Sequence, residues 1–277
     1  MLNVNQCNPL VVCFIIPIAC RNFTSNWDAA CNYLRQTIGS ILNSIDPRFA
    51  VVIVGHESPM HYLPKDPRLH FLQYSESAPL AVNKNMQTIA RDWMGKMQLG
   101  REYAKQKLPS EYVMRMDADD FLSNRVVGFL AQNSEKAAFR ISDGWLWNSG
   151  ARIFIQQLEN FDKLWCGSSI ILKSAIADLP IQIYELSDRM PVLDQAKIGS
   201  ARTLFTNEFH SFADKALSLH GLDIYKIPFR AAIYRVGNIN SVTGRSKTKI
   251  YSIRFMLGKI LRLRRMSKTL RNEFSLF

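Results

Sequence analysis

Three carboxylates lie within four residues of this chain, at Asp117, Asp119 and Asp120. They directly follow the segment EYVMRM of residues 111–116, whose composition predicts a buried strand. If the chain stays extended, Asp117 and Asp119 point to the same side, because side chains alternate along a strand. Two carboxylates held that close are stabilised by a hard divalent cation such as Mg²⁺ or Mn²⁺. We therefore expect a metal site here, with coordination positions open to the phosphate oxygens of a nucleoside diphosphate leaving group.

The acidic stretch also has a simpler interpretation, as the start of a helix. A helix is expected over residues 125–132, and either Asp120 or Ser123 could cap it. A single Asp-x-Asp pattern is weak evidence for a metal. Its position after a predicted buried strand favours the metal site, because ligands of open α/β sheets bind beyond the carboxyl ends of the strands.

The segments before the acidic stretch predict the sheet that would position it. Apolar runs at 11–18 and 50–54 are typical of buried parallel strands, and residues 27–44 between them have the spacing of an amphipathic helix. A third strand is expected at 68–74, followed by a long helix over 83–107. Strand, helix and strand in this order begin a right-handed parallel sheet.

The second half of the chain predicts further strands and no linker. Strands are expected at 167–173, 223–227 and 231–236, and a helix at about 211–220. We expect these elements to close the same sheet within one domain.

Composition indicates a globular protein with reduced thiols. Apolar residues make up 47% of the 277 residues, which is enough for a sizeable core. The five cysteines are odd in number and form no Cys-x-x-Cys pair, as expected for free thiols in a cytosolic chain. The uncharged start has no basic segment, and Pro9 and Pro17 bracket its short apolar run, which argues against a signal peptide.

Positive charge is concentrated at the end of the chain. The formal net charge is +12, and residues 244–277 hold ten Lys or Arg against one acid, Glu273. Apolar residues from Ile250 to Leu261 follow helical spacing, with basic residues mostly off that stripe. We expect a basic amphipathic helix that docks on an anionic membrane surface through residues 245–271, or alternatively a helix that packs on its own domain.

Four segments of the first half together resemble a known family: FIIPIACRN, TIGSILNS, AVVIVGHESP and MRMDADDFLSN. Their order is similar to the nucleotide-binding half of GT-A-fold glycosyltransferases of the family-two-like kind. The segments DGWLW, LWCGSSII, NEFHSF and IPFRAAIYRVGNINS are similar to a bacterial subgroup of these enzymes. The resemblance implies an α/β GT-A-like domain with a mostly parallel, Rossmann-like sheet over residues 1–243. Its halves are a nucleotide-sugar-binding part (1–122) and an acceptor part (123–243), and the basic tail follows (244–277).

The resemblance also implies a donor site. Pro17 and Arg21 would line the nucleotide, with Asp117 and the neighbouring Ala118 approaching the ribose. The family's base-binding Asp after the second strand is absent here.

Two residues could substitute for that Asp, His56 and Glu57. Lys84 could reach the diphosphate, or it could be an ordinary solvated lysine.

Metal ligands and a catalytic base follow from the same resemblance. Asp117 and Asp119 would bind Mn²⁺ or Mg²⁺. Many related enzymes add a late His, for which His210 is the candidate here, although a His among aromatics is also typical of a core. Glu208 would be the base of an inverting transfer, with His210 beside it, and Asp188 and Asp194 are weaker alternatives.

The sequence thus predicts a cytoplasmic enzyme, peripheral at the inner face of the cytoplasmic membrane. It would move a sugar from a nucleotide donor to a glycan or lipid-linked saccharide in bacterial surface polysaccharide synthesis (lipopolysaccharide, O-antigen or capsule). Two alternatives remain. A sugar nucleotidyltransferase is disfavoured because PIACRNFTSN lacks glycine, and a nucleic-acid-binding protein is disfavoured by the near-neutral body.

Overall fold

A computed structural model of the chain describes residues 9–76, 78, 86–148, 151–159, 161, 167–181, 203–206, 213–236 and 262–276. In chain order, the elements are β1 (Leu10–Pro17), α1 (Trp27–Leu42), β2 (Phe49–Gly55), the 3₁₀ helix η1 (Met60–Tyr62), β3 (Leu69–Gln73), α2 (Met86–Lys107), β4 (Ser110–Arg115), β5 (Phe121–Leu122), α3 (Val126–Gln132), β6 (Ala138–Arg140), β7 (Asp143–Asn148), β8 (Phe154–Glu159), β9 (Ile170–Lys173), α4 (Ser174–Ala177), α5 (Ala213–Ser218), β10 (Ile224–Lys226), β11 (Ala232–Val236), β12 (Leu263–Arg265) and α7 (Lys268–Glu273).

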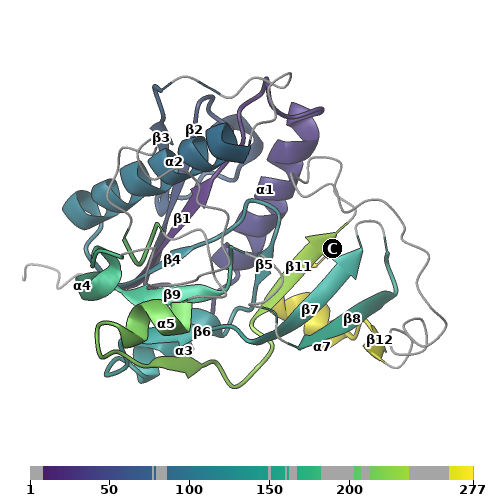
Figure 1. The fold of residues 1–277 in the computed structure, drawn as a ribbon. Coiled ribbons are helices and arrows are strands. Elements are labelled where there is room, and N and C mark those ends of the chain that lie inside the picture. Colours follow the sequence, from purple (N-terminus) through teal and green to yellow (C-terminus); the bar gives the residue numbers. More distant parts are fainter. Residues whose placement is uncertain are drawn as a thin grey trace, which may run out of the picture.

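The larger of two sheets has seven strands in the order β10-β6-β9-β4-β1-β2-β3. Strands β4, β1, β2 and β3 are mutually parallel, and β9 runs antiparallel to both β4 and β6. The first of these elements along the chain are the predicted strand, helix and strand, β1, α1 and β2. Because β1, β2 and β4 are parallel, their carboxyl ends share one edge of the sheet (Figure 1).

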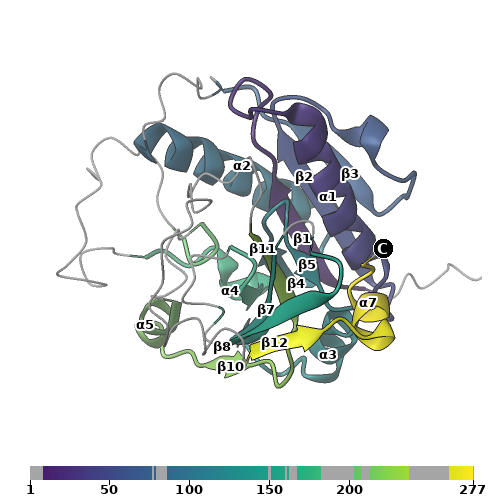
Figure 2. The same cartoon turned by 90° about the vertical axis from the view of Figure 1, so that its right-hand side faces the viewer.

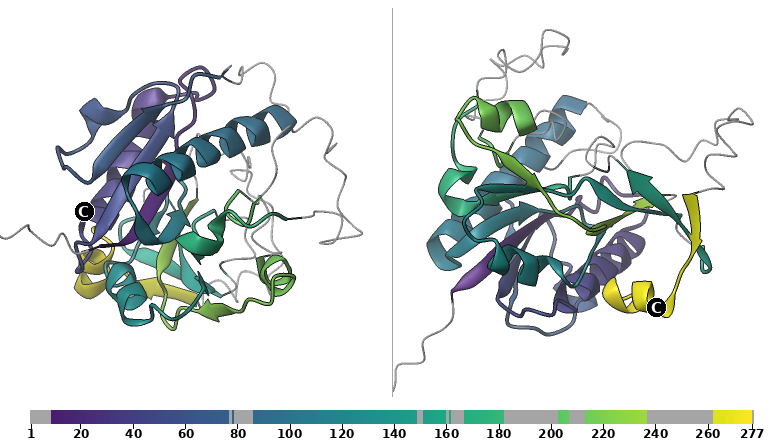
Figure 3. Two further views of the ribbon diagram at one scale, coloured as in Figure 1. Left: turned by 90° about the vertical axis from the view of Figure 1, so that its left-hand side faces the viewer. Right: turned by 90° about the horizontal axis from the view of Figure 1, so that it is seen from below.

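Helices cover both faces of this sheet, which explains the uninterrupted apolar runs of its strands. Phe14 and Val51 pack with α1 and α3 on one face, whereas Cys13 and Val52 pack with α2, α4 and α5 on the other. Figure 3 shows α2 lying across the strands on the side opposite α1. Asn26 caps α1, because its side chain accepts a hydrogen bond from the amide of Ala29.

The second sheet has five short strands in the order β12-β8-β7-β11-β5. Its core joins apolar side chains of β5, β7, β8 and β11 with four from the end of the chain. The eight buried members of this cluster are Phe121, Trp147, Ile155, Ile233, Met266, Leu270, Phe274 and Leu276. In Figure 2, β12 and α7 lie beside β8 and β7 at the outer side of this sheet.

The predicted α/β class with a mostly parallel sheet is confirmed. The second half of the chain differs from its prediction in one respect. Strands β9 and β10 extend the first sheet as expected, together with β6, which was not predicted. Strand β11 was expected in the same sheet, but with β5, β7, β8 and β12 it builds a sheet of its own.

The tail prediction is wrong for its described part. The amphipathic helix was expected to continue past Arg262, but Leu263–Arg265 form strand β12, which pairs antiparallel with β8. The apolar positions of residues 250–261 lie outside the described residues. Pairing with β8 overrides the helical spacing at these three exposed positions.

The last residues are tied to the domain body. The carboxylate of Glu273 accepts hydrogen bonds from the Ser123 hydroxyl at 2.5 Å and from Arg125 Nη2 at 2.8 Å. The amide of Asn124 donates to the Glu273 carbonyl at 3.1 Å. Residues 266–276 are therefore part of the folded domain. This agrees with the alternative interpretation of the tail, in which it packs on its own domain.

Other sequence predictions concern the thiols and the membrane. Cys13, Cys20 and Cys31 are free and buried, whereas Cys7 and Cys166 lie outside the described residues. Within the described ranges, no helix combines the length and the apolar character needed to cross a bilayer.

Candidate functional site

The acidic residues 117–120 form a turn, here called the acidic turn, at the carboxyl end of β4. The strand ends at Arg115, and the amide of Asp120 points back to the carbonyl of Asp117 at 3.4 Å. The chain therefore does not stay extended here, so strand alternation does not set the directions of Asp117 and Asp119. The turn is also fixed to helix α1, because the Thr37 hydroxyl donates to the carbonyl of Ala118 at 3.0 Å.

Asp117 faces the loop before β9. Its Oδ2 accepts a hydrogen bond from the amide of Gly167 at 2.8 Å, and its own amide donates to Ser168 Oγ at 2.9 Å. A Cβ at residue 167 would lie 2.3 Å from Asp117 Oδ1, so glycine is required for this close approach. Burial, reinforced by the negative charge of Asp119, raises the pKa of Asp117 to about 6.

Asp120, in contrast to the partly buried Asp117, is fully buried. Its Oδ2 accepts a hydrogen bond from Ser168 Oγ at 2.8 Å, and its Oδ1 lies 3.4 Å from the amide of Arg235. At the start of helix α3, Ser123 Oγ accepts a hydrogen bond from the Arg125 amide at 3.3 Å, as a capping residue would, whereas the Asp120 carboxylate bonds Ser168 and Arg235 instead. The one turn thus presents Asp117 toward β9 and fixes Asp120 in the core.

Arg235, on β11, is a buried cation behind the acidic turn. Its guanidinium carbon lies 4.6 Å from the ring centres of Tyr33 and Phe121 and 5.2 Å from that of Trp147. Nη2 donates to the Gln36 side chain at 2.7 Å. Burial lowers the pKa of Arg235, and the charges of Asp119 and Asp120 oppose that shift. The cation therefore partly balances the carboxylates of the turn.

The described residues meet the needs of a hard cation in part. Carboxylate oxygens are the donors that Mg²⁺ and Mn²⁺ prefer, and burial together with the charge of Asp119 raises the pKa of Asp117. Across the described part of the chain, no group of three or more His, Cys, Asp or Glu side chains could hold a metal. Asp120 cannot add a ligand, because its carboxylate points into the core. Mg²⁺ commonly uses one or two carboxylates together with phosphate oxygens and waters, so the pair fits such an ion.

The loops after β1 and β2 meet beside this edge of the sheet. Pro17 ends β1 and pairs with Val54, the residue before the end of β2. The amide of Arg21 donates to Glu57 Oε2 at 3.0 Å, and the Arg21 guanidinium lies 5.6 Å from the Trp27 ring. The structure therefore brings three predicted donor-site residues, Pro17, Arg21 and Glu57, to adjoining loops.

His56 has a different environment from Glu57. Its Nε2 lies 2.6 Å from Asp92 Oδ1, and Asp92 Oδ2 accepts from Lys96 Nζ at 2.6 Å. Lys96 is buried and also donates to the carbonyl of Ile18 at 2.9 Å. This network joins helix α2 to the loops after β1 and β2, so His56 is directed toward α2.

The predicted base and the remaining ligands lie outside the described residues: Lys84, Glu208, His210, Asp188 and Asp194. The described segment 203–206 ends two residues before Glu208. Arg115 Nη1 donates to the carbonyl of Phe205 at 3.4 Å, which ties this segment to the strand residue two positions before Asp117.

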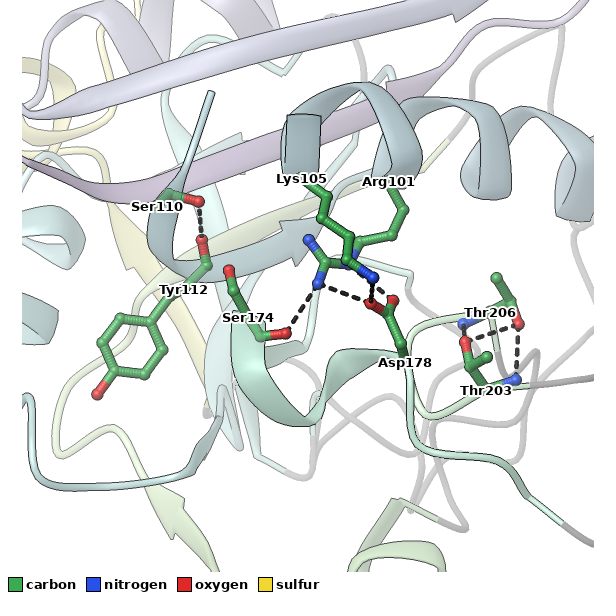
Figure 4. A network of polar contacts seen from close by, with 8 residues as sticks. All are labelled: Arg101, Lys105, Ser110, Tyr112, Ser174, Asp178, Thr203 and Thr206. Carbon is green, nitrogen blue, oxygen red and sulfur yellow. Dashed lines mark hydrogen bonds and ion pairs between the residues drawn. The ribbon is translucent and has the colours of Figure 1, made fainter. Parts of the chain in front are cut away.

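Segment 203–206 also contacts the end of α4, which ion pairs connect to α2 (Figure 4). Arg101 donates to both carboxylate oxygens of Asp178, and Lys105 Nζ lies 3.2 Å from Asp178 Oδ2. The residues on either side of Asp178 provide the carbonyls that accept from the amides of Leu204 and Phe205. Polar contacts thus lead from α2 to the chain that precedes Glu208.

Sequence reasoning missed several residues of this region. Ser168 and Arg235 both fix the acidic turn, and Asp92 and Lys96 fix the loop of His56. A signal existed for Arg235, because a cation within the apolar strand AAIYRV needs buried partners. Asp92 and Lys96 are four residues apart on a helix, a spacing that allows an ion pair.

Comparison with known proteins gives only distant similarity. No family model and no curated protein matches the sequence. Among solved structures, the chain is similar to S. aureus TarS 1-349, with 14% identity and a TM-score of 0.44 over 82% of this chain and 60% of that one. It is also similar to 4-diphosphocytidyl-2C-methyl-D-erythritol synthase from Anaerococcus prevotii, with 11% identity and a TM-score of 0.40 over 80% of this chain and 87% of that one.

Proposed function

We propose that this protein is a metal-dependent glycosyltransferase that uses a nucleotide-sugar donor. The observation that carries the proposal is the acidic turn. It follows a central parallel strand, on the edge of the sheet where ligands of open α/β folds bind, and it holds two mutually repelling carboxylates, Asp117 and Asp119.

The raised pKa of Asp117 supports a cation at this position. The shift means that burial and Asp119 make the ionised carboxylate of Asp117 unfavourable in the isolated protein. Asp117 and Asp119 would hold Mg²⁺ or Mn²⁺ together with the diphosphate of the donor. When bound, such an ion neutralises the charge that develops on the leaving diphosphate.

The adjoining loops supply groups suited to a nucleotide. Arg21 is exposed, and its backbone amide fixes the Glu57 carboxylate beside the end of β2. We assign the donor's base and ribose to Pro17, Arg21 and Glu57. His56 would act indirectly, because its ring is bonded to Asp92.

The acceptor would approach from the second half of the chain. An inverting transfer needs a base for the acceptor hydroxyl, and we assign this role to Glu208. The anchoring of Phe205 to Arg115 supports the assignment, because it fixes the preceding residues close to β4. A lipid-linked saccharide of bacterial surface polysaccharide synthesis, at the cytoplasmic face of the membrane, is the acceptor that we propose.

Calorimetry with nucleoside diphosphates tests the proposal. UDP, GDP, dTDP and CDP are titrated into the protein with and without Mn²⁺, and the best case is repeated with Asp119→Ala. We expect metal-dependent binding that weakens by about 10–100-fold or more in the variant. Residues that only hydrogen-bond to metal ligands already contribute that range. Asp223→Ala, at an exposed aspartate between α5 and β10, is the matched control and should bind as the parent does.

Two results would contradict the proposal. Absence of binding to every nucleotide, with or without metal, would make the acidic turn a structural feature. Release of pyrophosphate from a nucleoside triphosphate and a sugar phosphate would identify a nucleotidyltransferase instead.

A further inference from the structure

Large apolar side chains are exposed along the outer strands of the second sheet. Ile153, Phe154 and Leu263 are 54%, 53% and 40% exposed. Strand β12 is the edge strand, and its register with β8 pairs Arg265 with Phe154 and Leu263 with Gln156. Paired residues and residues two apart share a face, so Phe154, Leu263 and Arg265 lie together on one face.

The opposite face is packed on β8, whereas on the edge strand β12 the residue of that face, Arg264, is exposed. Ile155, between Phe154 and Gln156, is 1% exposed and belongs to the core with Met266 and Leu270. The outward apolar side chains are therefore not part of that core. Figure 1 shows β12 at the outside of the domain, beyond β7 and β8 as seen from β1 and β4.

Basic side chains surround this apolar set. We call the whole the β8–β12 surface, and define its basic part as Arg152, Arg262, Arg264, Arg265, Lys268 and Arg271, of which Arg271 is half-buried and the others are exposed. Within 262–276 the one acid, Glu273, is bonded to Arg125 and Ser123. Glu159 lies at the far end of β8, five residues from Phe154. The charge beside the apolar side chains is therefore strongly positive.

We infer that the β8–β12 surface docks on an anionic lipid membrane. Aromatic and aliphatic side chains flanked by arginine suit the boundary between headgroups and acyl chains, where the apolar parts insert and the guanidinium groups meet lipid phosphates. Each basic residue near an anionic leaflet strengthens binding, and an edge strand that carries arginine is protected against pairing with other strands. The docking element is thus a twisted pair of strands at the end of the second sheet.

The inference rests on the proposed function only for its purpose, which is access to a lipid-linked acceptor. Vesicle binding itself needs neither donor nor metal. A failure of membrane docking therefore leaves nucleotide binding unaffected, and the two can be told apart in the same preparations.

Vesicle sedimentation of the full chain provides the test. Sucrose-loaded vesicles of phosphatidylcholine alone, or with roughly 30 mol% phosphatidylglycerol, are mixed with protein at physiological ionic strength. We expect binding to the anionic vesicles that weakens as salt is added, and little binding to the neutral ones.

Two variants with matched controls locate the surface. Arg262→Gln/Arg264→Gln/Arg265→Gln should weaken the partition coefficient by about 100-fold, while Lys65→Gln/Lys107→Gln/Lys215→Gln, with the same charge loss at exposed lysines elsewhere, should change it by less than about threefold. Phe154→Ser/Leu263→Ser should weaken it by about tenfold or more. Ile45→Ser/Leu219→Ser, at residues 71% and 49% exposed, is its control.

Circular dichroism and thermal melting of each variant verify that the fold is retained. Equal losses for the surface variants and their controls would overturn the inference, as would equal binding to neutral and anionic vesicles. Binding to RNA or DNA that depends on these arginines, without vesicle binding, would assign the surface to nucleic acid.

Discussion

The two sheets differ in what fills their interiors. Strands β1, β2 and β4 of the first sheet lie between two layers of aliphatic and aromatic side chains. The second sheet encloses a cation, Arg235, among Tyr33, Phe121 and Trp147, and the end of the chain completes its core. The acidic turn leaves the first sheet and is fixed by the loop before β9, by α1 and by Arg235 of the second sheet. The difference indicates that an apolar framework holds the position of the turn, whereas a polar cluster sets the direction and charge of its carboxylates.

The largest effect is expected in the interior of the first sheet. Phe14 is fully buried and meets Phe49 edge to face, with ring centres 6.1 Å apart. Phe14→Ala should lower the free energy of unfolding by about 3–5 kcal/mol, because it leaves a cavity between sheet and helix. Urea denaturation measures the change. Ile45→Ala, at an exposed position, should stay within about 0.5 kcal/mol.

A somewhat smaller effect is expected from the buried cation of the second sheet. Arg235→Met retains much of the volume but removes the charge that opposes Asp119 and Asp120, and should cost about 3 kcal/mol. The double variant Asp120→Asn/Arg235→Met should lose less than the sum of the single losses, because the two groups share one network. If urea denaturation gave strictly additive losses in the free energy of unfolding, Arg235 and Asp120 would not be coupled, and the polar cluster of the second sheet would not act as one network.

The junction of the two sheets is tested by glycine substitutions. Gly167→Ala places a Cβ 2.3 Å from Asp117 Oδ1, so the carboxylate must move. We expect a loss of stability of about 1–2 kcal/mol and nucleotide binding weakened by about tenfold or more. At Gly39 in α1 nothing lies within 4 Å of such a Cβ, so Gly39→Ala should stabilise by about 0.5–1 kcal/mol and leave nucleotide binding unchanged. Unimpaired nucleotide binding by Gly167→Ala would remove Asp117 from the site.

The smallest effect is expected at the surface of the first sheet. Asp66 bonds Arg68 before β3, and these hydrogen bonds lower its pKa below the usual value of 3.8. The contact therefore contributes stability above about pH 3.8, and the contribution is lost as the pH falls through the lower folded-state pKa. Because both side chains are partly exposed, we expect about 0.5 kcal/mol. Asp66→Asn should remove roughly this amount from the fall in the free energy of unfolding between about pH 4 and 2. An unchanged dependence on pH would contradict this.

The first sheet could be predicted closely from the sequence. Strands β1, β2, β3 and β4 and helix α1 lie within two residues of their expected bounds. The physical reason is local: strands covered on both faces need continuous apolar runs, and an amphipathic helix shows its own period.

The direction of the acidic side chains could not be predicted in the same way. Asp120 meets Ser168 and Arg235, which are 48 and 115 residues away in sequence. Such partners bend the chain after Arg115, where alternation along a strand predicted an extended segment. The prediction of a helix at residues 263–265 failed for the same reason. Leu263 pairs with Gln156, which is distant in sequence, and this pairing overrides the local helical spacing.

The long-range contacts of the acidic turn also govern when it can form. Strands β1, β2 and β3 pair over shorter stretches of chain, as Val12 with Phe49 and Val51 with Leu69 show. By contrast, Arg235 must meet Asp120 across 115 residues and Glu273 must meet Arg125 across 148. Closing such large loops costs entropy before any contact is made, which slows folding. On a ribosome, the first sheet's parallel core emerges well before β11, β12 and α7 are synthesised. A newly made chain therefore has strands β1, β2 and β3 before the contacts of Asp120 with Arg235 and of Arg125 with Glu273 can form.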